Sequence, residues 1–113
     1  MANALQTPAP VSNPAPWNPD EIFPVLADPA RRRLLLALAR GGPQAGALLM
    51  HTVGKRLSAT VKHLTAMRAA GLLVMETDPA DGRRMRYGLS PAVPLMKTGT
   101  GAVIDFGFCL LRL

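Results

Sequence analysis

Residues 58–87 read "SATVKHLTAMRAAGLLVMETDPADGRRMRY" and divide into a helix and a β-hairpin joined by "AAGLL". In the first part, Thr60, Leu64 and Met67 fall on one face of an α-helix, and Gly71 stands where helices commonly end. The stretch therefore predicts a helix over about residues 57–70 with one packing face. The opposite face is free to contact a partner and carries Ser58, Ala59, Lys62 and Thr65.

The second part of this stretch has the pattern of two short strands around a polar turn. "LLVMET" alternates as a strand does, "DPADGR" contains the turn-forming pairs Asp-Pro and Asp-Gly, and "RMRYGL" favours a second strand. The hairpin spans about residues 72–89 and carries Arg83, Arg84 and Arg86. The sequence thus predicts a basic hairpin beside the free face of the helix.

Three further helices are predicted before residue 57. Asn18 and Asp28 are N-cap residues, each followed by a proline at the first helical position. The second of these helices stops at Gly41-Gly42, and "QAGALLMHTV" predicts a third, short helix over residues 44–53. The order of helix, helix, short helix, helix and hairpin is typical of the winged helix-turn-helix, whose recognition helix enters the DNA major groove. We therefore expect an α+β fold, mainly α, with a two-stranded β-wing.

Two longer segments resemble a known family. "VLADPARRRLLLALARGG" followed by "SATVKHLTAMRAAGLLVMETDPADGRRMRYGLSP" resembles the ArsR-type (arsenic-repressor type) winged-helix transcriptional regulators of bacteria. In that family an Asp-Pro-x-Arg stretch opens the second helix. The recognition helix ends His-Leu-x-x-Leu-x-x-Ala-Gly-Leu, and the wing ends Tyr-x-Leu-x-Pro. The resemblance covers residues 22–91.

The resemblance implies a transcriptional regulator, more specifically a repressor, that binds double-stranded DNA as a homodimer at a palindromic operator. Metal-sensing members carry a Cys-x-Cys type motif in the third helix or His/Asp/Glu clusters on the terminal helix, and this chain has neither, so we expect no metal and no cofactor. The residues expected at the DNA are Lys55, Arg56, Ser58, Ala59, Lys62 and His63 at the recognition helix, with Arg83, Arg84 and Arg86 in the wing. For His63 a buried hydrogen-bonding role is the alternative.

The distribution of charge favours a polyanionic partner. The chain has a net charge of +6, and residues 29–75 contain eight Lys or Arg and no acid. Within that segment, Arg31–Arg33 lie in the first turn of a helix, where the dipole disfavours cations, so they contact a phosphate, an acidic partner or solvent. A protein-interaction module that docks an acidic protein partner on the same scaffold is the alternative function.

The last residues, "GAVIDFGFCLLRL" (101–113), predict an extra C-terminal β-strand, since they are rich in β-branched and aromatic residues and interrupted by glycine. The segment is apolar on both faces and must be covered. Two interpretations remain open. In the first, the strand pairs with the wing sheet, in its own chain or its partner's, and builds the dimer. In the second, the strand only completes the core of the monomer.

The composition of the chain limits its domain organisation, its location and its chemistry. Residues 1–19 are rich in proline and carry no charge, which predicts a disordered arm before a winged-helix domain over 20–113. Cys109, the only cysteine, is expected in the core, and its isolation suits a reducing, cytoplasmic setting without disulfides. No apolar run is long enough to cross a membrane. The seven scattered acids form no set of nucleophile, base and orienting group, so we expect no enzymatic activity.

Overall fold

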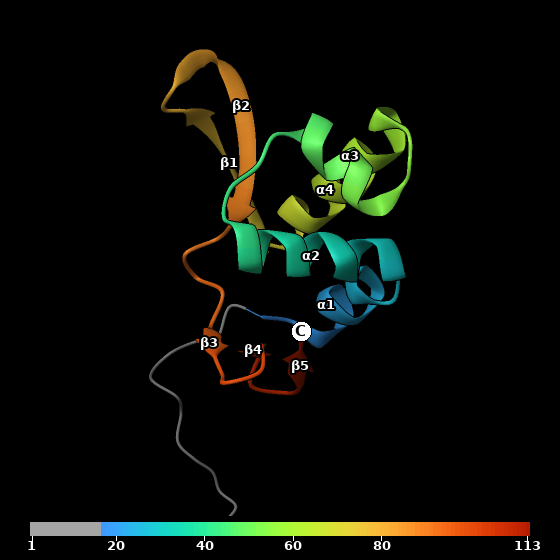
Figure 1. Cartoon of the computed structure of the whole chain (residues 1–113). Helices are drawn as coiled ribbons and strands as arrows, with labels where there is room; N and C mark the ends of the chain where they lie inside the picture. Colours follow the sequence, from blue (N-terminus) through green and yellow to red (C-terminus); the bar gives the residue numbers. More distant parts are fainter. Residues whose placement is uncertain (1–16) are drawn as a thin grey trace, which may run out of the picture.

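The computed structural model describes residues 17–113, which form four helices and two antiparallel sheets (Figure 1). The helices are α1 (Pro19–Leu26), α2 (Pro29–Gly41), α3 (Gly46–Val53) and α4 (Leu57–Ala69). The strands are β1 (Leu73–Asp78), β2 (Asp81–Leu89), β3 (Leu95–Lys97), β4 (Ala102–Asp105) and β5 (Leu110–Arg112). Within this part of the chain, no helix is both long and apolar enough to span a membrane.

Helix α2 lies in the middle of the molecule and separates two layers (Figure 1). On one side lie α3, α4 and the hairpin of β1 and β2, and on the other lie α1 and the small sheet of β3, β4 and β5. The apolar residues of α2 explain its position, because Leu34, Leu35 and Leu38 are almost completely buried in the shared core. Removal of such side chains from water is the main force that holds the two layers together.

The predicted starts of α1 and α2 are confirmed. The side-chain oxygen of Asn18 accepts a hydrogen bond from the backbone N–H of Asp20 at 2.9 Å, and Asp28 accepts one from Ala30 at 2.8 Å. Each cap is followed by a proline, which needs no hydrogen-bond partner at the first helical position. Both helices therefore begin where local side-chain chemistry favours it.

The wing is the antiparallel hairpin of β1 and β2, with Leu73 opposite Leu89 and Glu76 opposite Arg86. Its turn is shorter than the six residues expected from "DPADGR", because only Pro79 and Ala80 separate the strands. The carboxylate of Asp78 accepts a hydrogen bond from the N–H of Ala80 at 2.8 Å, and this contact stabilises the short turn. The rest of the expected turn belongs to β2.

The C-terminal segment forms β-structure as expected, but it contains two strands and does not pair with the wing of its own chain. Strand β4 pairs with β3 on one side and β5 on the other, in a sheet separate from the wing. The chain reverses at Gly107, whose φ of +91° favours glycine, and the N–H of Phe106 donates to the carbonyl of Cys109 at 2.9 Å. This turn divides the predicted segment into a hairpin of β4 and β5. Strand β3, which precedes this hairpin, was not predicted.

The C-terminal sheet completes the core of the monomer. Ile104 and Phe106 are fully buried. Phe106 contacts Trp17 edge to face, with ring centroids 5.5 Å apart, and Phe108 packs in the same way on Phe23 of α1 at 5.2 Å. Residues 17–19, which the sequence assigned to the arm, therefore belong to the folded part, and residues 1–16 of the predicted arm lie outside the described residues.

Candidate nucleic-acid interface

The turn between α3 and α4 fixes the start of the expected recognition helix. Gly54 ends α3 with a φ of +67°, and its N–H donates to the carbonyl of Met50 at 2.9 Å. The left-handed backbone is accessible to glycine without the steric penalty of a Cβ atom. The tight turn leaves Lys55 and Arg56 exposed immediately before α4.

Helix α4 has the two faces that the sequence predicted. Thr60, Leu64 and Met67 are completely buried, and the hydroxyl of Thr60 is satisfied by the carbonyl of Arg56 at 2.9 Å. On the other side, Ser58 and Lys62 are exposed and Ala59 is half-buried. The burial of one face holds the helix on the core, so the opposite face is available to a partner.

His63 differs from its neighbours on α4 because it is held by α2. Its Nδ1 accepts a hydrogen bond from Nε of Arg31 at 3.1 Å, and its Nε2 lies 3.9 Å from a carboxylate oxygen of Asp28. The hydrogen bond from the backbone N–H of Ala30, followed by the charge of the nearby Arg31, holds the pKa of Asp28 below its usual value. The imidazole thus links the first turn of α2 to the recognition helix.

Arg31 and Arg32, at the start of α2, find partners within the chain. Arg31 donates to the carbonyls of Pro24 and Val25 at 3.4 Å, and Arg32 donates to the carbonyl of Leu26. These carbonyls form the end of α1, where the helix dipole is negative and favours a cation. The dipole at the end of α1 therefore offsets the unfavourable position of these cations at the start of α2.

The three arginines of the wing have different surroundings. Arg86 donates from Nε and Nη2 to one oxygen of Glu76 on the neighbouring strand, at 2.9 and 2.6 Å. The side chain of Arg83 is 92% exposed and lies 3.4 Å from Asp81. Arg84 is exposed and forms no ion pair within the described residues. Arg84 is consequently the wing cation that is most available to a phosphate.

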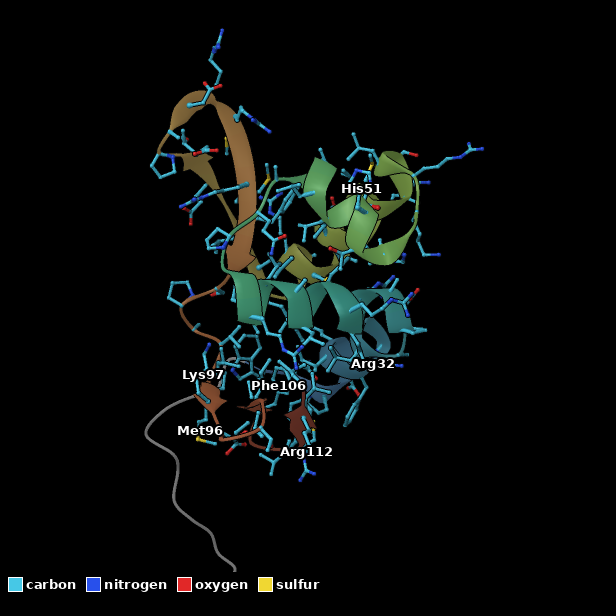
Figure 2. The ribbon with its side chains drawn as sticks, viewed as in Figure 1. Arg32, His51, Met96, Lys97, Phe106 and Arg112 are labelled. Carbon is cyan, nitrogen blue, oxygen red and sulfur yellow. The ribbon has the colours of Figure 1, made fainter. Side chains whose placement is uncertain are left out.

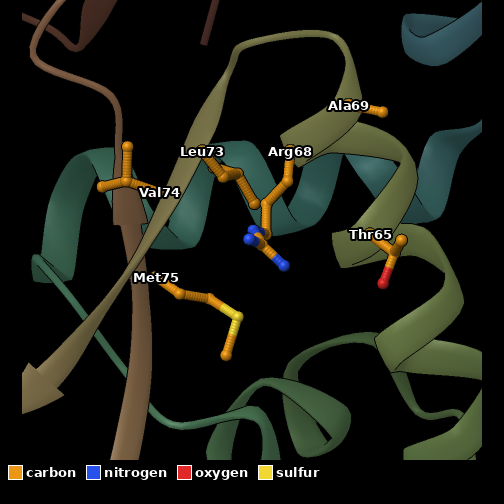
Figure 3. Close-up of a pocket in the computed structure, with 6 residues that line it drawn as sticks. All are labelled: Thr65, Arg68, Ala69, Leu73, Val74 and Met75. Atoms are coloured by element: carbon orange, nitrogen blue, oxygen red, sulfur yellow. The ribbon is translucent and has the colours of Figure 1, made fainter.

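A hollow of about 510 Å³ lies between α4 and β1 (Figure 3). Two polar residues that line it, Thr65 and Arg68, were not in the predicted site. Thr65 and Arg68 line it from the helix, and Met75 lines it from the strand. Figure 3 shows the guanidinium of Arg68 between the helix and the strand. Arg68 follows the outward-facing Thr65 by three residues, so helical spacing alone places it near the free face of α4.

An isolated β-bridge connects the wing to the segment that precedes α3. Gln44 and Tyr87 exchange two backbone hydrogen bonds, of 2.9 and 2.8 Å, just before α3 begins. Tyr87 is buried against the core, and the ring of Pro43 lies 3.1 Å from the position of a Cβ at Gly88. These contacts fix the direction of β2 relative to α3 and α4.

The described residues form no metal-binding cluster. Across residues 17–113, no three His, Cys, Asp or Glu side chains gather at one place. His51 is exposed on α3 (Figure 2), whereas His63 is held by Arg31. Cys109 is half-buried against the hydrophobic core, as expected for an apolar role.

Comparison with known proteins confirms the resemblance to ArsR-type regulators. The chain is 34% identical over 76 residues to the arsenic resistance transcriptional regulator ArsR1 of Pseudomonas putida, covering 67% of this chain and 57% of that protein. It is 40% identical over 65 residues to the HTH-type transcriptional regulator CmtR of Mycobacterium tuberculosis, covering 58% and 52%. The chain thus spans little more than half the length of these relatives. No family model matches.

Solved structures confirm the winged-helix fold. A probable transcriptional regulator from Pseudomonas aeruginosa superposes with a TM-score of 0.54 at 28% identity, over 57% of this chain and 48% of that one. A transcriptional regulator from Thermotoga maritima superposes with a TM-score of 0.56 at 22% identity, over 65% and 51%. The mixed α+β architecture, rich in helix, is therefore the one expected from the sequence.

Proposed function

Because the winged-helix part of this chain is similar to that of ArsR-type transcriptional regulators, we propose that the protein is a sequence-specific DNA-binding regulator, acting as a repressor in the cytoplasm. It binds double-stranded DNA as a homodimer. Helix α4 lies in the major groove, and the wing contacts the backbone or the minor groove. Repression and dimerisation are carried over from the resemblance, and two-fold symmetry of the dimer requires a palindromic operator.

The observation that supports DNA binding best is the row of exposed cations along α4 and the turn before it. Lys55, Arg56, Lys62 and Arg68 are all exposed, and none forms an ion pair within residues 17–113. The sequence between Pro29 and Met75 contains no acid that would repel a phosphate. Neutralisation of DNA phosphates by such side chains releases counterions, which supplies much of the affinity.

The contacts of each residue follow from its position. Ser58 and Ala59 lie on the free face of α4, near its N-terminus, where recognition helices reach base edges, and Lys62 on the same face binds a phosphate. Lys55 and Arg56 bind phosphates beside the helix start, and Arg84 binds a phosphate at the wing. Arg68 adds a phosphate contact in the hollow between α4 and β1. His63 holds the orientation of α4 through Arg31 and reads no base.

The experiment that tests this function is the selection of duplexes from a random pool by the purified chain. The winning duplex and a scrambled control are then titrated at two salt concentrations. We expect the winner to bind at least about a thousandfold more tightly than the control and to contain two symmetric half-sites. The affinity should fall with a log–log slope of about −0.9 for each phosphate contacted.

Lys62→Gln and Arg40→Gln form a matched pair for the same titration. Both cations are exposed, but Arg40 belongs to the last turn of α2 and not to α4 or the wing. In a dimer, loss of Lys62 removes two phosphate contacts, so the salt slope should become shallower by about 1.8, whereas Arg40→Gln should leave it unchanged. Equal, weak and salt-labile binding of both duplexes would refute sequence-specific regulation. That result would favour the alternative of an acidic protein partner.

A further inference from the structure

A second hollow, of about 300 Å³, lies between the first half of α2 and strand β5. Its apolar walls are Pro29 and Leu36 from the helix and Leu111 and Leu113 from the C-terminal segment. The sheet that contains β5 lies on the opposite side of α2 from α3 (Figure 1). The hollow is therefore separate from the proposed DNA-binding surface.

Three arginine residues line the same hollow. They are Arg32 and Arg33 of α2 and Arg112 of β5. In the part of the chain that the structure describes, none of the three forms an ion pair with a carboxylate. Arg32 donates to the carbonyl of Leu26, while Arg33 and Arg112 are exposed and keep their donors available. Figure 2 shows Arg32 and Arg112 on these two separate elements.

Apolar walls and uncompensated arginines together define the chemistry of a ligand. A guanidinium binds a carboxylate through paired, charge-assisted hydrogen bonds, which are stronger than those between neutral groups. The walls favour an aliphatic or aromatic body over a compact inorganic ion. The volume is at the lower end of ligand pockets, which suits a molecule of roughly ten non-hydrogen atoms.

We propose that this hollow, the α2–β5 pocket, binds a small organic carboxylate whose apolar body contacts Leu36 and Leu111 and whose anionic group is bound by Arg33 and Arg112. The pocket adjoins the first turn of α2, in which Arg31 holds His63 of α4. A bound ligand therefore acts on the element that orients the recognition helix. This effect on DNA rests on the proposed function, whereas binding of the carboxylate does not.

Binding is tested by titrating the full chain with hexanoate, octanoate and benzoate while the methyl signals of Leu36 and Leu111 are followed by NMR. 1-Octanol and octylammonium serve as neutral and cationic controls that carry the same eight-carbon chain as octanoate. We expect saturable shifts with at least one carboxylate, and binding at least about tenfold weaker for octanol and octylammonium, since a hydrogen bond to a charged group changes affinity by this factor or more.

The variants Arg33→Gln and Arg112→Gln test the charged half of the pocket, and Arg40→Gln is the control. All three replace an exposed arginine, but Arg40 does not line the pocket. The first two should bind the carboxylate at least about tenfold more weakly, with unchanged melting temperature, and the control should bind as the wild type does. Absence of saturable shifts with all three carboxylates, or equal affinity for octanoate and octanol, would overturn the proposal.

A separate titration with duplex DNA distinguishes the pocket from the proposed function. If Arg33→Gln and Arg112→Gln weaken DNA binding as much as Lys62→Gln does, these arginines bind phosphates and the ligand assignment is overturned. If carboxylate binding is lost in the variants while DNA binding is retained, the pocket is confirmed as an independent site. Carboxylate binding by a chain that binds no duplex would confirm the pocket and refute only the proposed function.

Discussion

The Nε–H of Arg31 donates a hydrogen bond to Nδ1 of His63 across 3.1 Å, joining two helices through residues that lie 32 positions apart in the sequence. Since Nδ1 accepts, the ring proton lies on Nε2, which faces Asp28 at 3.9 Å. Asp28 also caps α2 through Ala30. One carboxylate therefore stabilises both the start of α2 and the imidazole of the recognition helix.

The first prediction concerns the charge of Asp28, tested by Asp28→Asn. Asparagine retains an oxygen that caps the helix but carries no charge. Hydrogen bonding to Ala30, followed by the nearby charges, lowers the pKa of Asp28 in the folded chain. The ionised carboxylate therefore stabilises the fold above the unfolded-state pKa of about 3.9, and this contribution is lost as the pH falls through the lower folded value.

Thermal unfolding at a series of pH values measures this effect. The melting temperature of the wild type should exceed that of Asp28→Asn at neutral pH, and the difference should shrink as the pH falls below the unfolded-state pKa of about 3.9. The control Glu21→Gln removes an exposed carboxylate from α1 and should keep the acid-dependent loss of the wild type. A difference between wild type and Asp28→Asn that does not vary with pH would contradict the assignment.

The second prediction concerns Gly54, in the turn before α4. Its φ of +67° is unfavourable for residues with a Cβ atom, although nothing lies within 4 Å of the position that the Cβ would occupy. Gly54→Ala should therefore reduce the free energy of unfolding by about 1–2 kcal/mol through backbone strain alone. Gly82→Ala is the matched control, with equally open surroundings and no positive φ. Equal stability of the two variants in urea unfolding would show that the turn relaxes.

The parts of the fold that were predictable depend on neighbours in the sequence. The caps at Asn18 and Asp28 act within two residues, and the buried face of α4 follows from helical periodicity. The wing followed from alternation and from the Asp-Pro and Asp-Gly pairs. The residues expected at the DNA were chosen by the same local reasoning, and helical spacing also places Arg68 near the outward-facing Thr65.

The parts that were missed depend on contacts between distant residues. A single apolar segment cannot reveal that Gly107 adopts a left-handed turn and sends β5 back along β4. The pairing of Arg86 with Glu76 depends on the register of the hairpin, and that of Arg31 with His63 on helix packing. Composition marks such residues as candidates for DNA contact, but only the tertiary structure shows which cations are already engaged.

The third prediction concerns Phe106, which connects the C-terminal sheet to the core. The ring is 1% exposed and contacts Trp17 and Phe108. Phe106→Ala removes this contact area and leaves a cavity, which should lower the free energy of unfolding by about 3–5 kcal/mol. Leu48→Ala, at a side chain of α3 that is 59% exposed, should change it by less than about 0.5 kcal/mol. Similar effects of both variants would contradict the packing of this sheet on the monomer.

The fourth prediction separates two arginines of the wing. Arg86 is bound to Glu76, whereas Arg84 is exposed without an ion pair among the described residues. If the wing contacts DNA phosphates, Arg84→Gln should make the salt slope of binding shallower by about 0.9 for each subunit, and Arg86→Gln should have a smaller effect. Filter binding at several salt concentrations measures both. A larger effect of Arg86→Gln would mean that the ion pair opens at the DNA.

The last prediction concerns the surface through which two copies associate. Phe23, Met96 and Leu110 are 53, 53 and 67% exposed, and Phe23 reaches the C-terminal sheet through Phe108. Exposed apolar side chains of this size favour burial against a partner, and a second copy covers them in the proposed homodimer. A truncation cannot test this surface, since Ile104 and Phe106 are needed for the core, so a point substitution is required.

Leu110→Lys provides that test, with Leu48→Lys as its control. Both leucines are more than half exposed, but Leu48 lies on α3, in the layer on the other side of α2. Sedimentation velocity should show a dimer for the wild type and for Leu48→Lys, and a shift toward monomer for Leu110→Lys, because a lysine in an apolar interface must lose its hydration. A dimer that survives Leu110→Lys would move the interface away from the C-terminal sheet, and a monomeric wild type would exclude the proposed symmetric binding to a palindrome.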